Sequence, residues 1–255
     1  KMHMDTLQIV PTSQIDILPK TAGVYFFYEN SEIIYIGKAI NIKDRVKNHF
    51  FQPTYKDKSF IERINKIGFM ETNSEIEALI LEANLIKKYQ PKFNVVWRDD
   101  KNYFYVAIDK NKEGVPYVYI THQPRKVSSI KYKVSSIRNT KYSILNTQHI
   151  GPFVDGGAIK KTLKYLRKVF PYYTSKTHSK NKCTWCHLGL CPGPELFLPN
   201  HKKNTRLRQD YVGQIKKLIL ILKGKRKTVL NSLKKEMNDL SKKKEFEKAL
   251  KIRDR

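Results

Sequence analysis

The chain has 255 residues, 40% of them hydrophobic, which is enough to bury a core and to build two or three structural units. The longest aliphatic run, LILIL at 218–222, is much shorter than a membrane span, and the first ten residues lack the features of a signal peptide. We therefore expect a soluble, cytoplasmic protein with no membrane partner.

The charge of the chain is strongly positive and unevenly distributed. The 50 Lys and Arg residues outnumber the 23 Asp and Glu residues, which gives a net charge of +27. Residues 1–100 hold 14 basic and 13 acidic residues, whereas residues 101–255 hold the other 36 and 10. Such a polycation favours nucleic acid, because its side chains neutralise phosphates and release counterions. A solvated lysine-rich surface and a ribosome-associated protein are the alternatives.

The first predicted element is a β-hairpin in GVYFFYENSEIIYIG at 23–37. Apolar and aromatic residues alternate with a period of two before the polar ENSE, and β-branched residues follow it. If the turn is centred on Asn30 and has three residues, Tyr25 lies directly opposite Tyr35 on one face of the sheet. Tyrosines in a hairpin are more often core residues than catalytic ones, and Lys38, just after Gly37, is weak evidence by itself.

A helix is predicted next over NIKDRVKNHF at 41–50, with Asn41 as the N-cap and Asp44 placed for a capping box. Three apolar residues at helical spacing form its buried stripe: Ile42, Val46 and Phe50. Arg45 and His49 stand one turn apart and can reach the same point. They are either an exposed polar flank, or an arginine that binds phosphate and a histidine that transfers protons.

A second helix is predicted over SEIEALILEANLIKKY at 74–89, with Ser74 and Glu77 in capping-box spacing. It is apolar nearly all round, so most of it should be buried. Glu82 lies inside this apolar stretch, and a buried carboxylate must be neutralised, paired or bound to a cation. A salt bridge to Lys87 or another lysine is the alternative. Pro91 ends the helix, and KFNVVW after it reads as another strand.

The rest of the chain combines short strands with basic helices. Strand-like runs, YFYVAI and VPYVYI, lie between 103 and 150, and a helix is predicted at 158–170 after GPF and before Pro171. A basic helical tail runs from about Arg206 to the end, with a break at Gly224 and a final helix pair.

All three cysteines, Cys183, Cys186 and Cys191, lie within nine positions. An odd, tightly clustered set indicates metal or redox chemistry rather than a disulfide framework. His187 and His178 are close in sequence. Three thiolates and a histidine suit Zn²⁺, three thiolates hold an iron–sulfur cluster less securely, and the absence of any metal is the third possibility.

Five ordered motifs resemble the GIY-YIG nuclease family: GVY at 23–25, YIG at 35–37, the arginine of the next helix, the glutamate of LEANLIKKY, and FN after Pro91. Within it, the chain resembles UvrC of bacterial nucleotide excision repair. IGPF before a helix ending in FP, the cysteine cluster, and EFEKALKIRDR, which is similar to the UVR motif, follow in the UvrC order.

The resemblance implies an α+β fold, in which a small nuclease domain with a central antiparallel sheet flanked by helices covers 15–97. A mixed strand and helix region at 98–171, a Cys-rich segment at 172–200 and a basic helical region at 201–255 follow. The UVR hairpin covers about 225–255.

The resemblance also implies roles for individual residues. Glu82 would hold one Mg²⁺ or Mn²⁺, Tyr35 would activate the attacking water, Tyr25 would orient the site, and Arg45 and Lys38 would neutralise the scissile phosphate. Asn94 matches the family asparagine and would support the site by hydrogen bonding. Where UvrC usually has tyrosine, this chain has His49, which can share the base role because a neutral phenol with a pKa near 10 is a poor base.

The cysteine segment departs from the UvrC pattern of four cysteines, which would hold an iron–sulfur cluster. Cys183 and Cys191 match that pattern and Cys186 is extra, whereas Ser175 and Glu195 stand where cysteines are expected. The candidate ligands are therefore Cys183, Cys186, Cys191 and His187, for zinc or a cluster.

The resemblance predicts a DNA endonuclease that nicks the damaged strand of a duplex on the 3′ side of the lesion. It predicts UvrB as the partner, bound through an apolar stripe on the terminal hairpin. The RNase H-like and helix-hairpin-helix domains of full UvrC are not in the sequence, so we expect a fragment or a short homologue of the Cho class. The alternatives are a stand-alone GIY-YIG nuclease, a non-catalytic adaptor that recruits UvrB, and an RNA-binding protein.

Overall fold

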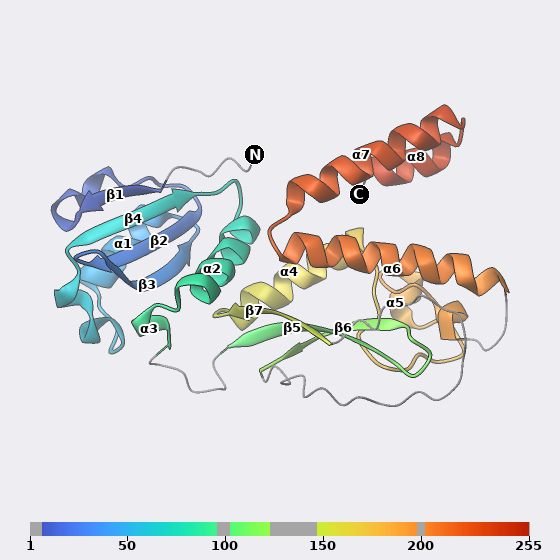
Figure 1. Ribbon diagram of the computed structural model, residues 1–255, viewed down its shortest axis with the longest axis horizontal. Helices are drawn as coiled ribbons and strands as arrows, with labels where there is room; N and C mark the ends of the chain where they lie inside the picture. The colour runs from blue at the N-terminus through green and yellow to red at the C-terminus, as the bar shows by residue number, and fades with distance from the viewer. Residues whose placement is uncertain (1–6, 96–102, 123–146, 198–201, 255) are drawn as a thin grey trace. The chain divides into compact units, whose positions relative to one another are not determined.

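The computed structural model describes residues 7–95, 103–122, 147–197 and 202–254 (Figure 1). The chain divides into two compact units, one formed by residues 1–104 with 151–159 and the other by 105–150 with 160–255. The mixed strand and helix content confirms the predicted α+β class. Among the described helices, none is long and apolar enough to cross a bilayer.

The first unit is built on an antiparallel sheet of four strands in the order β1-β4-β2-β3. Its strands are β1 (Gln8–Pro11), β2 (Gly23–Glu29), β3 (Glu32–Ala39) and β4 (Lys66–Glu71). β2 lies between β3 and β4, and is buried along almost its whole length. This central position explains why the predicted hairpin is so rich in aromatic and β-branched residues.

The predicted hairpin forms, but its register differs from the one expected. Glu29 pairs with Glu32 across a two-residue loop, and a bulge then shifts the pairing so that Tyr35 lies opposite Phe27 and Gly37 opposite Tyr25. The prediction that Tyr25 faces Tyr35 directly is therefore wrong. The two rings still share a face as diagonal neighbours, with centroids 6.2 Å apart.

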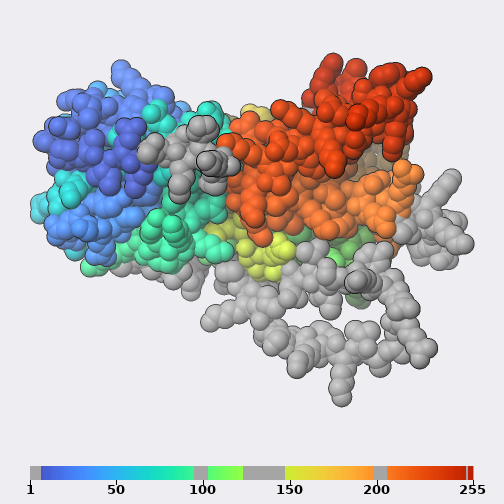
Figure 2. All heavy atoms as spheres, turned by 45° about the horizontal axis from the view of Figure 1, so that its top comes forward, coloured from blue at the N-terminus to red at the C-terminus, as the bar shows by residue number. Residues whose placement is uncertain are grey.

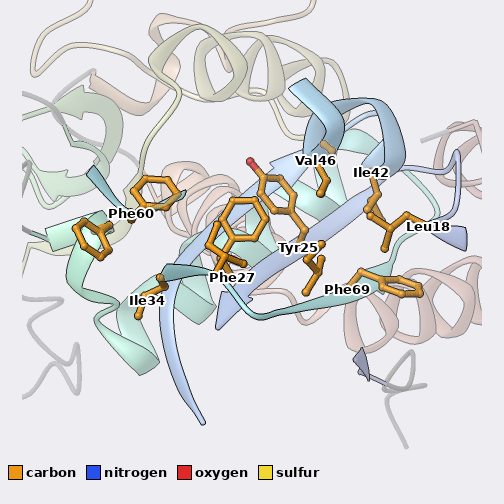
Figure 3. Packing of buried hydrophobic residues seen from close by; sticks show 12 residues of the cluster. Leu18, Tyr25, Phe27, Ile34, Ile42, Val46, Phe60 and Phe69 are labelled. Atoms are coloured by element: carbon orange, nitrogen blue, oxygen red, sulfur yellow. The ribbon is translucent and has the colours of Figure 1, made fainter. Parts of the chain in front are cut away.

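Helices cover both faces of this sheet. A short 3-10 turn η1 (Thr12–Ile17) and helix α1 (Ile42–Phe51) lie on the face that holds Tyr25 and Phe27, and Figure 3 shows these side chains packed with Phe60, Ile42 and Val46. Two further 3-10 turns, η2 (Asp57–Ser59) and η3 (Ile61–Arg63), connect α1 to β4. The opposite face packs on α2 (Glu75–Tyr89), so both sides of the sheet are dry.

The caps of the two predicted helices are confirmed. The Asn41 side chain accepts a hydrogen bond from the Asp44 amide, and the Ser74 hydroxyl accepts one from the Glu77 amide. The strand expected after Pro91 is wrong: Lys92–Val95 form the short helix α3, and residues 96 and 97 lie outside the described part. Gln90 turns left-handed with φ 48° and redirects the chain before α3.

A second sheet has three strands in the order β6-β5-β7. The strands β5 (Phe104–Lys110) and β6 (Pro116–Thr121) are the two predicted runs, and β7 (Gln148–Phe153) includes GPF. Helix α4 (Gly156–Val169) follows as expected. The described part of the cysteine segment contains the one-turn α5 (Thr184–His187) and the 3-10 turn η4 (Pro194–Phe197).

The C-terminal region consists of three helices. They are α6 (Lys202–Leu222), α7 (Arg226–Lys242) and α8 (Phe246–Arg253), and Gly224, with φ +78°, makes the predicted break between the first two. α6 is anchored to the sheet through the Tyr211 hydroxyl, which donates to the Pro116 carbonyl over 2.7 Å. Figure 2 shows the surface of α6, α7 and α8 in orange and red.

Candidate active site and cysteine cluster

The seven predicted site residues all belong to the first unit but come from five different elements. β2 supplies Tyr25, β3 supplies Tyr35 and Lys38, α1 supplies Arg45 and His49, α2 supplies Glu82, and α3 supplies Asn94. α1 packs on the face of the sheet that holds Tyr25, whereas α2 packs on the other face and its Glu82 reaches the same hairpin at the edge strand β3, where it accepts a hydrogen bond from the Lys38 amide.

Tyr25, His49 and Asp57 form a buried hydrogen-bonded chain. The Tyr25 hydroxyl lies 2.6 Å from His49 Nε2, and His49 Nδ1 lies 2.7 Å from Asp57 Oδ1. Burial raises the pKa of Asp57, but hydrogen bonds from the Thr54 amide and hydroxyl outweigh it, so the pKa lies below the usual range and Asp57 is ionised. An ionised carboxylate only accepts, so His49 donates from Nδ1, and neutral Nε2 accepts from the Tyr25 hydroxyl.

His49 is uncharged at neutral pH. Burial lowers the pKa of His49, as do the positive charges of Arg45 and Lys56, and together these effects outweigh the raising effect of Asp57. The result is a neutral imidazole whose basic nitrogen points at a phenol, with a carboxylate behind it. The order of groups, carboxylate, imidazole and hydroxyl, is that of an Asp-His-Ser triad, with a phenol in place of the serine hydroxyl.

Tyr35 and Arg45 complete the group around the Tyr25 hydroxyl. The ring of Tyr35 lies 5.8 Å from that of His49, edge to face, and 6.2 Å from that of Tyr25, and the Arg45 guanidinium is close enough to lower the pKa of Tyr25. Burial raises the pKa values of Tyr25 and Tyr35 far above 10, while the Arg45 guanidinium pulls both down. Both phenols are therefore neutral at rest, and Arg45 is placed to stabilise a transient negative charge on Tyr25.

Gly37 makes this geometry possible. A Cβ built at Gly37 would lie 2.4 Å from the Tyr25 hydroxyl oxygen, because the phenol ring lies across the backbone of β3 at this point. No other residue type allows that approach. The glycine of the YIG motif is therefore required by the position of the Tyr25 ring.

Glu82 is buried as predicted, with only 4% of its surface exposed. Its Oε1 accepts a hydrogen bond from the Lys38 backbone amide over 2.9 Å, whereas its Oε2 is buried without a hydrogen-bond partner. Burial raises the pKa of the Glu82 carboxyl to about 7, against the opposing effect of the Lys38 amide and ammonium. A desolvated carboxylate with one oxygen left unused is the arrangement that a hard cation stabilises.

Lys38 and Asn94 lie at the outer side of β3. The Lys38 ammonium lies 3.6 Å from the Glu75 carboxylate, and it is the Lys38 backbone that contacts Glu82. Asn94 donates to the Ile36 carbonyl over 2.9 Å and accepts from the Ile36 amide over 2.8 Å. Both hydrogen bonds of the Asn94 side-chain amide go to the backbone of Ile36. Asn94 therefore positions β3, the strand that carries Tyr35.

The cysteine segment, in the second unit, brings four donors together. The donor atoms of His178, Cys183, Cys186 and Cys191 all lie within 4.8 Å of one another. His187, the histidine predicted as a ligand, is exposed and is not a member of this group. The cluster therefore takes its nitrogen donor from the residue that precedes the cysteines rather than from the one beside Cys186.

Comparison with known proteins finds the same family that the sequence motifs resemble. Residues 21–95 match the family described as the UvrC-like GIY-YIG domain, and residues 227–255 match the UvrB/uvrC motif. UvrABC system protein C from Clostridium tetani is 34% identical over 252 residues, which cover 95% of this chain and 36% of that protein. Its counterpart from Thermoanaerobacter sp. is 33% identical over 251 residues, 94% of this chain and 37% of that protein.

Residues 21–95 thus belong to the UvrC-like GIY-YIG domain family, and the chain is similar to UvrC along 95% of its length. It spans about a third of the length of the curated UvrC relatives that it matches. The GIY-YIG N-terminal endonuclease domain of UvrC from Thermotoga maritima, in a magnesium-bound crystal structure, is 40% identical to this chain in sequence. The alignment covers 32% of this chain and 93% of that domain, with a TM-score of 0.31.

Sequence reasoning missed one member of this site. Asp57 is 5% exposed and fixes the tautomer of His49, yet it begins the single 3-10 turn η2, which is too short for any periodicity to point to it. The available signal was the spacing of Thr54 and Asp57, which is that of a local side chain to backbone turn. A buried turn of this kind next to a predicted active-site histidine is worth testing as a partner.

Proposed function

We propose that this chain is a metal-dependent DNA endonuclease that nicks the damaged strand on the 3′ side of a lesion in nucleotide excision repair. The observation that carries the proposal is the chain Asp57–His49–Tyr25, which lies in the same small domain as a buried carboxylate with an unused oxygen. The match of residues 21–95 to the UvrC-like GIY-YIG domain and the similarity to UvrC proteins support the substrate class, and so does the net charge of +27.

The residues fit a single divalent cation of the Mg²⁺ or Mn²⁺ type. Glu82 Oε2 is the donor, since it is buried without a partner, and a hard ion that keeps several waters needs few protein ligands. Such an ion, when bound, polarises the phosphate and stabilises negative charge on the leaving oxygen. The pKa of about 7 at Glu82 means that the carboxylate is available for a cation from neutral pH upward.

The residues of the chain supply the proton transfer. His49 Nε2 takes the proton of the Tyr25 hydroxyl, with Asp57 holding the imidazole and stabilising its protonated form. Tyr25, made basic in this way, takes the proton of the attacking water, and Arg45 lowers the cost of the negative charge on the phenol oxygen. Tyr35, whose ring lies 6.2 Å from that of Tyr25 and which is only half-buried, is the alternative base.

Partner binding is assigned to the terminal hairpin. α7 and α8 pack on each other and leave three large apolar residues exposed: Leu230, Phe246 and Leu250. Exposed apolar residues at helical spacing on a lysine-rich hairpin fit an equivalent amphipathic hairpin, which we assign to UvrB. The protein would then act in the bacterial cytoplasm, on lesion-bearing duplex DNA of the nucleoid.

A nicking assay on a duplex with one lesion, with and without UvrB, tests the proposal. Wild type should nick the damaged strand 3′ to the lesion only when Mg²⁺ or Mn²⁺ is present. His49→Ala should lower the rate by about 100-fold or more, whereas Asn48→Ala, on the exposed side of the same helix, should leave it unchanged. A chain that binds UvrB and DNA but never nicks would be an adaptor, and the proposal would be refuted.

A further inference from the structure

The cysteine segment does not fit the iron–sulfur cluster that the UvrC resemblance implies. Ser175 and Glu195 occupy two positions where that cluster would need cysteines. The chain instead adds Cys186 and brings His178 into the same group. We infer that His178, Cys183, Cys186 and Cys191 hold a single zinc ion.

The spacing of the donors fits one ion rather than a cluster. Cys183 Sγ lies 3.3 Å from Cys186 Sγ, Cys186 Sγ lies 3.3 Å from His178 Nε2, and all four donor atoms lie within 4.8 Å of each other. Zinc bonds of about 2.3 Å to sulfur and about 2.0 Å to nitrogen place tetrahedral donors roughly 3.6 to 3.8 Å apart. In a cubic cluster each thiolate binds a different iron, and the sulfurs lie roughly 6 Å apart.

His178 is held in the tautomer and orientation of a metal ligand. Its Nδ1 lies 2.7 Å from the Ser179 carbonyl oxygen, which can only accept, so the ring proton is on Nδ1 and the lone pair on Nε2 faces Cys186. The ring is fixed edge to face against Tyr173 and stacked on Phe197. A backbone carbonyl behind the distal nitrogen is the usual outer contact of a metal-bound histidine.

A tight backbone turn holds Cys183 and Cys186 close together. The Cys186 amide donates to the Cys183 carbonyl over 2.9 Å, and the Gly189 amide donates to the Cys186 carbonyl over 3.0 Å. Gly189, with φ +69°, then turns the chain between Cys186 and Cys191. The backbone of the segment thus fixes the spacing of the donors.

The ion would supply the structure that this segment lacks. Between α4 and α6 the described chain has only the one-turn α5 and η4, so few backbone hydrogen bonds hold it. Closing the loop from His178 to Cys191 would fix Trp185 where the Arg167 guanidinium lies 4.9 Å from its ring, and Leu190 where Arg167 donates to its carbonyl over 2.7 Å. The site is therefore structural, with four protein ligands and no open position.

Metal analysis of the full 255-residue chain, produced in medium that contains both iron and zinc and purified without oxygen, tests the inference. We expect about one zinc per chain, with no stoichiometric iron or acid-labile sulfide. Co²⁺ added alone to the zinc-free chain should give the absorption of a tetrahedral site with three thiolates and one imidazole. Iron with equimolar sulfide, or a metal-free chain with a Cys183–Cys186 disulfide, would overturn the inference.

Two histidine variants identify the fourth ligand. His178→Ala should weaken zinc binding by more than the 10- to 100-fold that loss of an outer contact costs, whereas His187→Ala, at an exposed histidine nine positions away, should bind zinc like wild type. If His178→Ala does not fold, His178→Cys should still fold and bind zinc, with the Co²⁺ spectrum changed to that of four thiolates. Full zinc affinity in His178→Ala, or loss of zinc in His187→Ala, would contradict the assignment.

Discussion

Replacing Glu82 with glutamine should stabilise the nuclease domain of the metal-free chain at alkaline pH, although the change removes the proposed metal ligand. In the folded chain burial raises the pKa of this carboxyl from 4.5 to about 7. A raised carboxyl pKa favours the folded state below pH 4.5, and that contribution is lost as the pH rises through 7. Ionised Glu82 therefore weakens the fold, and glutamine cannot ionise.

The size of the effect follows from the pKa difference. A shift from 4.5 to about 7 corresponds to about 3 kcal/mol of destabilisation once Glu82 is fully ionised. Glutamine keeps an oxygen for the Lys38 amide but places an unpartnered NH₂ where Oε2 was, which costs about 1 kcal/mol or more at every pH. The difference in free energy of unfolding between Glu82→Gln and wild type should thus rise by about 2 to 3 kcal/mol from about pH 5 to about pH 8.

Hydrogen exchange read by mass spectrometry measures this locally, in peptides from β2, β3 and α2, after correction for the intrinsic pH dependence of exchange. Glu62→Gln is the control, because Glu62 is an exposed carboxylate of the same domain. Mg²⁺ at a hundred times its dissociation constant should stabilise wild type by about 2.7 kcal/mol and should leave Glu82→Gln unaffected, so that wild type becomes the more stable of the two proteins. An advantage of the variant that is equal at both pH values would refute the reasoning.

The proton chain and the hairpin give three further predictions. At saturating Mg²⁺, which keeps Glu82 ionised, the nicking rate of wild type should fall on acidification with a midpoint below 6.5, because burial lowers the pKa of His49, and a midpoint above 6.5 would contradict this. Asp57→Asn should lower the rate by about 10-fold or more and move that midpoint further down, because Asp57 is the group that raises the pKa of His49; an unchanged pH profile would remove Asp57 from the chain. Phe246→Ala should weaken UvrB binding by about 10-fold or more in a titration, and Lys242→Ala, in a solvated last turn, should not.

The sequence was sufficient to predict an element or a burial state wherever the local residue pattern agrees with the environment in the fold. The two capped helices, the hairpin and the buried state of Glu82 were all predictable, since periodicity and capping residues act over a few positions. The register of the hairpin was not, because one bulged residue, Ile34, shifts every later pair and leaves no mark in the pattern. Likewise the KFN segment reads as a strand, but tertiary contacts of Asn94 with Ile36 favour a helical turn.

Asp57 and His178 illustrate a second reason for the limits of prediction. Each contacts a residue eight positions away in the sequence. Asp57 contacts His49, and His178 contacts Cys186, and the chain between the two partners does not follow one regular element. Candidate partners close in sequence, such as His187, are favoured by spacing alone even though the folded chain turns them outward. Loop geometry decided these contacts, and no periodic signal encodes it.

The hydrogen bonds that Asn94 and Glu82 make to β3 have one more consequence. β3 is an edge strand, and its outward amides at Ile36 and Lys38 are both taken by side chains, one from α3 and one from α2. An open strand edge is a template for pairing with another chain. Asn94 and Glu82, which the motif presents as catalytic residues, therefore also occupy the strand edge and oppose self-association of the domain. An inactive alanine variant at either position should be checked for aggregates before its lost activity is ascribed to chemistry.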